Sequence, residues 1–85
     1  MILMKIDDIR SYLVLAEVKN FTKASDQLFI TQPTLSKAIF RMEEELGLRL
    51  LARDTHGVEL TEAGKLAVIK FEQIVEIYDE FLNEV

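Results

Sequence analysis

The sequence predicts a mainly α-helical fold that includes one short β-hairpin. Apolar residues recur at spacings of three and four along several segments, which is the period of an α-helix. The single proline and the three glycines fall near the expected ends of these segments, where they mark boundaries between elements. A hydrophobic fraction of 49% is ordinary for a globular chain. The length of 85 residues indicates one domain at most.

Two short helices are expected first. Asp7 is a good N-cap for a helix that runs to about Lys19, with apolar residues following at helical spacing. Thr22 is expected to cap a second helix that ends at Leu28, and residues 29–30 form a turn after it. The connection to the next helix is therefore short, which predicts a helix-turn-helix.

The third helix is expected to begin after Thr31, whose hydroxyl can cap it, and Pro33 is tolerated in its first turn. Gly47 ends it, as a glycine commonly does at a helix C-terminus. Its buried stripe consists of apolar residues spaced one helical turn apart, namely Leu35, Ile39, Met42 and Leu46. The acidic run 43–45 is expected to face solvent on different sides of this helix.

A short hairpin should follow. Residues 50–53 and 58–60 can pair as two strands, and residues 54–57 form the loop between them. Gly57 supplies a residue that tolerates positive φ in this loop. The hairpin completes a winged helix-turn-helix over residues 1–60, with three helices in the core and the hairpin as the wing.

The last helix is predicted over residues 62–85, opened by Thr61 and Glu62. It would be roughly 36 Å long at about 1.5 Å per residue, so the small domain can cover only its start. Its apolar residues alternate at spacings of four and three, which is a heptad seam: Ala67, Phe71, Ile74, Tyr78, Phe81 and Val85. The seam could pack on its own domain, but its length favours pairing with a second copy. We therefore expect a linker and dimerisation helix.

The third helix has a polar face that suits duplex DNA. Residues off the buried stripe face outward, namely Gln32, Pro33, Thr34, Ser36, Lys37, Phe40 and Arg41. Glutamine can bond adenine, lysine can bond guanine, and threonine offers a hydroxyl and a methyl group. A helix-turn-helix places one helix in the major groove, with the wing against the neighbouring backbone. The plainer alternative is a solvated polar face.

The net charge of −5 argues against nucleic-acid binding, but its distribution weakens the objection. Residues 1–60 hold eight Lys and Arg against nine Asp and Glu, whereas residues 61–85 hold two against six. From Leu28 to Met42 there is no acid, and Lys37 and Arg41 are the only charges. A local basic face therefore exists on an acidic chain.

Other classes of function find little support. No cysteine is present and His56 is the single histidine, so we expect no disulfide scaffold, no metal site and no cofactor. No nucleophile elbow or glycine-rich loop accompanies the serine, histidine and aspartate residues, so we expect no enzyme activity. No apolar run is long enough to span a membrane, and a cytoplasmic location is expected.

With this layout assembled, the chain resembles the N-terminal DNA-binding domain of LysR-type transcriptional regulators from about Ile6 to its end. Order and spacing are intact in the matching segments, which are Phe21-Thr22-x-Ala24, Thr31-Gln32-Pro33-Thr34-Leu35-Ser36-Lys37-x-Ile39, Met42-Glu43-Glu44-Glu45-Leu46-Gly47, Leu50-x-x-Arg53 and Leu60-Thr61-Glu62-Ala63-Gly64. The resemblance implies a winged helix-turn-helix, a dimerising linker helix, and a further effector-binding domain that this chain does not contain. Any small-molecule effector would act through that domain.

By matching position, the resemblance implies DNA contacts from Thr31, Gln32, Pro33, Thr34, Ser36 and Lys37, with Arg53 and His56 on the wing. Thr22 and Arg41 complete the expected set. The chain departs from the family pattern at four places: Lys19-Asn20 replaces glycine-serine, Lys37 replaces arginine, Phe40 replaces a polar or basic residue, and His56 replaces arginine at the wing tip. For His56 the alternative is ordinary solvated surface. For the whole chain the alternative is a dimerisation or partner-binding module with little DNA affinity.

Overall fold

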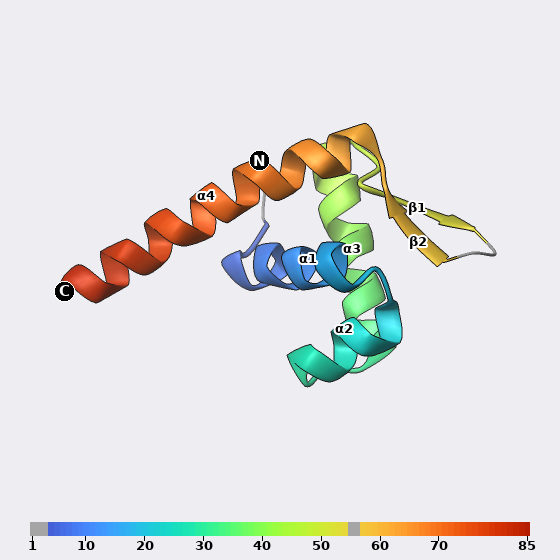
Figure 1. Ribbon diagram of the computed structural model, residues 1–85, viewed down its shortest axis with the longest axis horizontal. Coiled ribbons are helices and arrows are strands. Elements are labelled where there is room, and N and C mark those ends of the chain that lie inside the picture. The colour runs from blue at the N-terminus through green and yellow to red at the C-terminus, as the bar shows by residue number, and fades with distance from the viewer. Residues whose placement is uncertain (1–3, 55–56) are drawn as a thin grey trace.

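The computed structural model describes residues 4–54 and 57–85, which form four helices and a two-stranded antiparallel hairpin. In chain order the elements are α1 (Ile6–Val18), α2 (Phe21–Leu28), α3 (Gln32–Leu46), β1 (Leu51–Asp54), β2 (Gly57–Leu60) and α4 (Glu62–Glu84). The first three helices group together, the hairpin projects to one side, and the far half of α4 extends away on the other (Figure 1). The predicted fold class is confirmed.

Two predicted helix caps are wrong. Lys5, not Asp7, occupies the N-cap of α1, and its side chain makes no capping bond. Asp7 instead lies in the first turn, where its charge complements the positive end of the helix dipole. The side chain of Asn20 caps α2 by accepting from the Lys23 N–H at 2.9 Å, so Thr22 is one residue inside the helix.

Three other predicted helix ends are confirmed. The hydroxyl oxygen of Thr31 accepts from the Thr34 N–H at 3.2 Å and caps α3. The hydroxyl oxygen of Thr61 caps α4 by accepting from the Gly64 N–H at 3.0 Å. Gly47 ends α3 at a φ of 67°, in the left-handed region that glycine adopts without strain.

The hairpin is shifted slightly from its predicted position. The strand β1 begins at Leu51, and Leu51 pairs with Leu60. Asp54 and Gly57 belong to the strands rather than to the loop, and Gly57 has the expected positive φ of 123°. Residues 55–56, which include the predicted DNA contact His56, lie outside the described residues.

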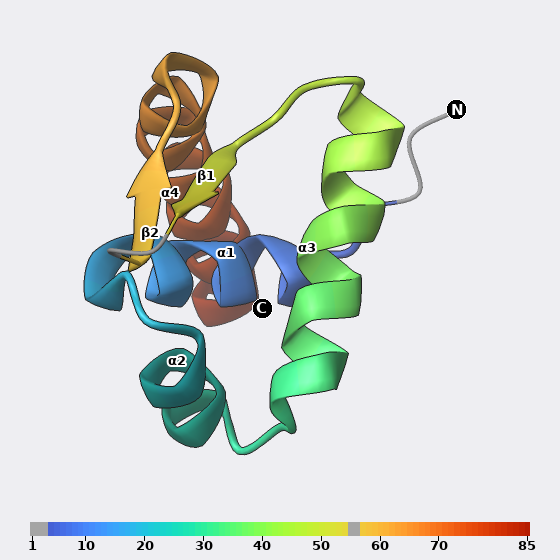
Figure 2. The ribbon, with the colours of Figure 1, turned by 90° about the vertical axis from the view of Figure 1, so that its right-hand side faces the viewer.

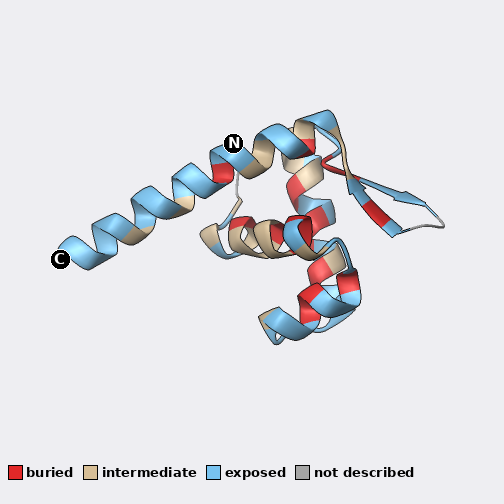
Figure 3. Cartoon of the chain, in the orientation of Figure 1, coloured by how far each residue is buried: buried red, intermediate tan, exposed pale blue. Residues whose placement is uncertain are grey.

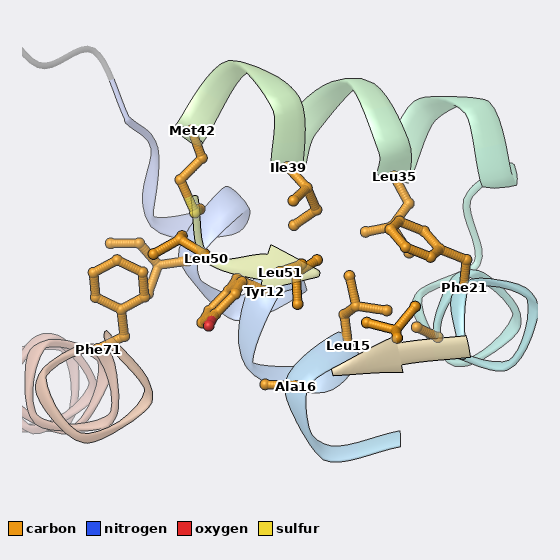
Figure 4. Close-up of a cluster of buried hydrophobic side chains, with 13 residues drawn as sticks. Tyr12, Leu15, Ala16, Phe21, Leu35, Ile39, Met42, Leu50, Leu51 and Phe71 are labelled. Carbon is orange, nitrogen blue, oxygen red and sulfur yellow. The ribbon is translucent and has the colours of Figure 1, made fainter. Parts of the chain in front are cut away.

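The core lies between α1 and α3 and is closed by the start of the wing (Figure 4). The stripe predicted on α3 is buried at Leu35, Ile39 and Met42, whereas Leu46 is only partly buried. Tyr12 is fully buried, and its hydroxyl donates to the carbonyl oxygen of Gly64 at 2.8 Å. This bond joins α1 to the first turn of α4.

The side chain of Glu43 does not face solvent as expected. Its Oε2 accepts from the Leu50 N–H at 2.8 Å and from the Leu51 N–H at 3.3 Å. The chain must leave α3 and enter β1 here, so two backbone donors need an acceptor, and the carboxylate supplies it. One member of the acidic run therefore fixes the base of the wing.

Phe71 was expected in the dimerisation seam of α4, but the structure buries it. It is only 7% exposed, and its ring packs edge-on against Tyr12 with the two centroids 5.7 Å apart. Phe71 thus belongs to the core of its own domain. Beyond it, Arg10 of α1 forms an ion pair with Asp79 at 2.6 Å, and the last part of α4 is largely exposed (Figure 3).

Candidate nucleic-acid interface

The N-terminal end of α3 is the most exposed part of the helix-turn-helix. Residues 31–34 are all exposed. The Thr31 hydroxyl donates to the Thr34 hydroxyl at 2.8 Å, which fixes the orientation of both side chains. Gln32 makes no side-chain hydrogen bond to the residues that the structure describes, so its amide is available to a ligand. The first turn therefore offers polar groups on a rigid base.

A shallow hollow lies beside this helix end, between α3 and β1. It has a volume of about 510 Å³ and is lined by Ser36, Lys37, Phe40, Arg41 and Arg53. A second hollow, of about 310 Å³, continues it toward the base of the wing and is lined by Phe40, Glu43, Arg49, Leu51 and Arg53. We call the two together the trough. Figure 2 shows α3 and β1, the two elements that supply most of its lining residues.

Arg53 is positioned by an aromatic ring. Its guanidinium carbon lies 4.1 Å from the centroid of the Phe21 ring, a cation–π contact. Phe21 is buried at the start of α2, so it holds Arg53 against the body of the domain. The contact leaves the guanidinium N–H groups free to meet an anion. It also links the wing to the helix-turn-helix.

The structure brings most of the predicted DNA contacts to one side. Ser36, Lys37, Arg41 and Arg53 share the first hollow, next to the exposed end of α3. Thr22 is exposed in the first turn of α2 and does not line the trough. The guanidinium of Arg41 lies 3.5 Å from a carboxylate oxygen of Asp8, so its charge is partly neutralised within the domain.

Four residues that line the trough were not among the predicted DNA contacts, namely Phe40, Glu43, Arg49 and Leu51. Phe40 is 55% exposed and lines both hollows, and Arg49 lines the second. The exposed position of Phe40 follows from its place off the stripe of α3, as the helical spacing predicted. For Arg49 the only signal was a cation just before the hairpin, which does not say where the side chain lies.

The expected dimerisation seam divides into two parts. Ala67 and Phe71 are packed on their own domain, whereas the rest of the seam is exposed, namely Ile74, Tyr78, Phe81 and Val85. Ile77 and Leu82, which flank these residues, are exposed as well. The second half of α4 therefore presents a row of large apolar side chains.

None of the helices in residues 4–54 and 57–85 is both long and apolar enough to cross a membrane.

Comparison with known proteins gives the relationships of this chain. The sequence pattern of the bacterial regulatory helix-turn-helix proteins of the lysR family matches residues 6–65. The HTH-type transcriptional regulator BudR of Raoultella terrigena is 43% identical over 81 residues, which are 95% of this chain and 28% of that protein. The DNA-binding transcriptional dual regulator OxyR of Escherichia coli (strain K12) is 43% identical over 65 residues, 76% of this chain and 21% of that protein. The chain thus spans less than a third of the length of these two relatives.

Solved structures agree. The crystal structure of a complex of BenM_DBD with benA site 1 DNA superimposes with a TM-score of 0.90 at 33% identity, and the match covers 95% of this chain and 94% of that one. The crystal structure of CbnR, a LysR family transcriptional regulator, gives a TM-score of 0.91 at 27% identity, over 95% of this chain and 28% of that one. The chain has the winged-helix fold of these DNA-binding domains, and it belongs to the lysR family of bacterial regulatory helix-turn-helix proteins.

Proposed function

We propose that this chain binds a specific sequence of double-stranded DNA as a homodimer and thereby regulates transcription. One observation carries the proposal: the exposed end of α3 and the unpaired cations Lys37 and Arg53 lie on the same side of the domain. That side combines groups that suit base edges with charges that suit phosphates.

The N-terminal turn of α3 would enter the major groove. Gln32 is suited to adenine, Lys37 to guanine, and Thr34 to the methyl group of thymine. Arg53 on β1 would meet the neighbouring backbone or minor groove, and we propose the same role for His56 from its position in the family pattern. Thr22 and Arg41 would contact phosphates at the edges of this surface.

The relatives support DNA as the partner. BenM_DBD, which is 33% identical and is matched over nearly its whole length, was crystallised with DNA of benA site 1 and of catB site 1. The net charge of −5 remains compatible with this partner because, among the described residues, four of the cations are paired with carboxylates, whereas Lys37, Arg49 and Arg53 at the trough are not. Three of the six cations that form no ion pair with the described residues therefore lie where DNA would lie.

The exposed half of α4 supports pairing with a second copy. Its row of apolar residues would otherwise remain in water, and contiguous apolar patches on soluble domains mark interaction sites. Two copies would also present two α3 helices, and a dimer of helix-turn-helix domains binds two half-sites.

The DNA proposal is tested by selecting bound sequences from a random duplex pool, then measuring affinity for the best duplex over a series of salt concentrations. We expect one preferred sequence, and log K should fall with log salt at about 0.9 per phosphate contacted. Lys37→Ala should lose about 1–3 kcal/mol on the preferred duplex and relax the preference at one base pair. A chain that shows no preference and no salt dependence is instead the partner-binding module.

The dimer proposal is tested by sedimentation. Even an association of about 1 μM should appear as dimer well above that concentration. Phe81→Glu places a charge in the apolar row and should give monomers, whereas Asn83→Glu adds the same charge at an exposed polar position and should leave the dimer intact. A wild-type chain that stays monomeric at high concentration contradicts the proposal.

A further inference from the structure

The trough between α3 and β1 gathers positive charge that the domain does not use. Arg49 makes no ion pair or side-chain hydrogen bond with the residues that the structure describes, and neither does Lys37. The guanidinium of Arg53 packs on the face of the Phe21 ring and makes no ion pair or hydrogen bond with the residues that the structure describes. By contrast, Arg10, which lies outside the trough, is paired with Asp79, and Arg41, which lines the trough, is paired with Asp8. Lys37 and Arg53 line the first hollow, and Arg49 and Arg53 line the second, so the unpaired cations follow the length of the trough and indicate a site for an anion.

The backbone beneath Arg49 is held on both sides. Its own carbonyl oxygen accepts from the hydroxyl of Thr61 at 2.5 Å. The next N–H, of Leu50, donates to Glu43 at 2.8 Å, and the Leu50 carbonyl accepts from the Thr61 N–H at 3.1 Å. These bonds also occupy one carboxylate oxygen of Glu43, the acid that lines this part of the trough. Arg49 therefore projects from a fixed base.

Phe40 gives the trough an apolar wall between these cations. It lines both hollows, and more than half of its side chain is exposed. An exposed phenylalanine does not bind phosphate, but its ring can pack against the apolar faces of a deoxyribose. An arginine and an aromatic ring side by side thus match the alternation of phosphate and sugar along a DNA strand.

The positions of α3 and the wing indicate which part of a DNA duplex would lie in the trough. If α3 lies in the major groove and the wing lies along the neighbouring minor groove, the strand that separates the two grooves must run between α3 and β1. We propose that the trough holds the sugar–phosphate backbone of this strand, with Arg49 bonding a phosphate and Phe40 packing on the adjacent deoxyribose. The inference rests on the proposed function and adds two DNA-contacting residues to it.

Arg49 is tested by the salt dependence of binding to two duplexes, the preferred duplex from the selection and a mixed-sequence duplex of equal length. Arg49→Ala should weaken both equally and should lower the slope of log K against log salt by about 0.9 per protomer, because one phosphate contact is lost. Arg49→Lys should restore most of the slope. Lys70→Ala removes the same charge from the exposed surface of α4 and should leave the slope unchanged.

The contact of Phe40 with the DNA backbone is tested by replacing Phe40 with a negatively charged residue. Phe40→Glu should weaken binding to both duplexes by about tenfold or more, because it faces a phosphate with a like charge. Phe40→Leu keeps an apolar wall and should bind within about twofold of wild type. The side chain is largely exposed, so both variants should unfold at the wild-type temperature, which shows that any loss of binding arises at the interface.

Three outcomes overturn the assignment. The first is an Arg49→Ala slope equal to wild type, and the second is a loss confined to the preferred duplex, which would mean that Arg49 contacts a base. The third is full DNA affinity in Phe40→Glu. If the wild-type chain binds neither duplex, the proposed function itself fails, and this result is distinct from wild-type binding with an unchanged Arg49→Ala slope.

Discussion

Replacing Gly64 by alanine should destabilise this domain more than any other glycine substitution in it. Gly64 is buried in the first turn of α4. A Cβ atom at this position would lie 2.0 Å from the carbonyl oxygen of Leu50 and 2.9 Å from the hydroxyl of Tyr12. The Leu50 oxygen cannot move freely, because it also accepts from the Thr61 N–H at 3.1 Å. The new methyl group would therefore force α4 away from the base of the wing.

The magnitude follows from three effects. Forcing atoms into a packed site costs about 1–3 kcal/mol, and a clash with fixed backbone belongs at the upper end, about 3 kcal/mol. Disturbing the hydrogen bond from Tyr12 to the Gly64 carbonyl adds about 1 kcal/mol. Alanine favours a helix over glycine by about 1 kcal/mol, which opposes the loss. The free energy of unfolding should fall by about 3 kcal/mol, a large part of the 4–13 kcal/mol or so expected for a chain of this length.

The assay is urea unfolding followed by the helical circular dichroism signal at one protomer concentration, because association makes stability depend on concentration. Gly47→Ala is the matched control. It has a φ of 67° and no atom within 4 Å of the added Cβ, so its cost is backbone strain alone, about 1 kcal/mol. If the free energy of unfolding of Gly64→Ala lies within about 0.5 kcal/mol of the wild-type value, α4 can move at little energetic cost and the packing argument is wrong.

Three further predictions concern stability. Burial, with a smaller effect from a nearby carboxylate, raises the pKa of Tyr12 from 10.0 to about 12. The contribution of this group to the free energy of unfolding is therefore complete below about pH 10 and is lost as the pH rises toward 12. Tyr12→Phe should remove that loss in unfolding curves measured across this range. Thr31→Ala should cost about 1 kcal/mol in urea unfolding because α3 loses its cap, whereas Thr31→Ser should keep the wild-type value; equal values for both variants would exclude the capping bond. The hydrogen bond from Arg10 lowers the pKa of Asp79, so the ion pair stabilises the domain above the usual carboxyl pKa of about 4, and this effect fades as the pH falls below that value. Arg10→Ala should therefore lower the unfolding temperature at neutral pH. An equal lowering in strong acid would contradict this.

The local sequence determined the elements and most of their ends. Helical periodicity and the residue types at the ends predicted the four helices and the hairpin, because capping and glycine conformation depend on a few neighbouring residues. Thr31, Thr61 and Gly47 act as predicted. The predicted caps of the first two helices were wrong. At α1 the helix begins before Asp7, after Lys5, whose side chain makes no capping bond. At α2 both Asn20 and Thr22 can cap a helix, and the burial of Phe21 at the first position of α2 selects Asn20.

The same local information indicated the exposed face of α3 with its expected DNA contacts, since a residue off the buried stripe must point outward. The family resemblance supplied the remaining candidates on the wing. Both kinds of information concern one element at a time. They do not state how far two elements lie from each other.

Only the tertiary structure decided which side chains meet across elements. Periodicity assigned Phe71 to a seam on α4, but the crossing of α4 over α1 buries it against Tyr12. Glu43 was expected in solvent, yet the return of the chain into β1 gives it two backbone donors. Arg49 and Phe40 are separated by nine positions in the sequence and line one trough. The physical reason is the same each time: burial and pairing depend on distances between elements, which spacing along a single element does not determine.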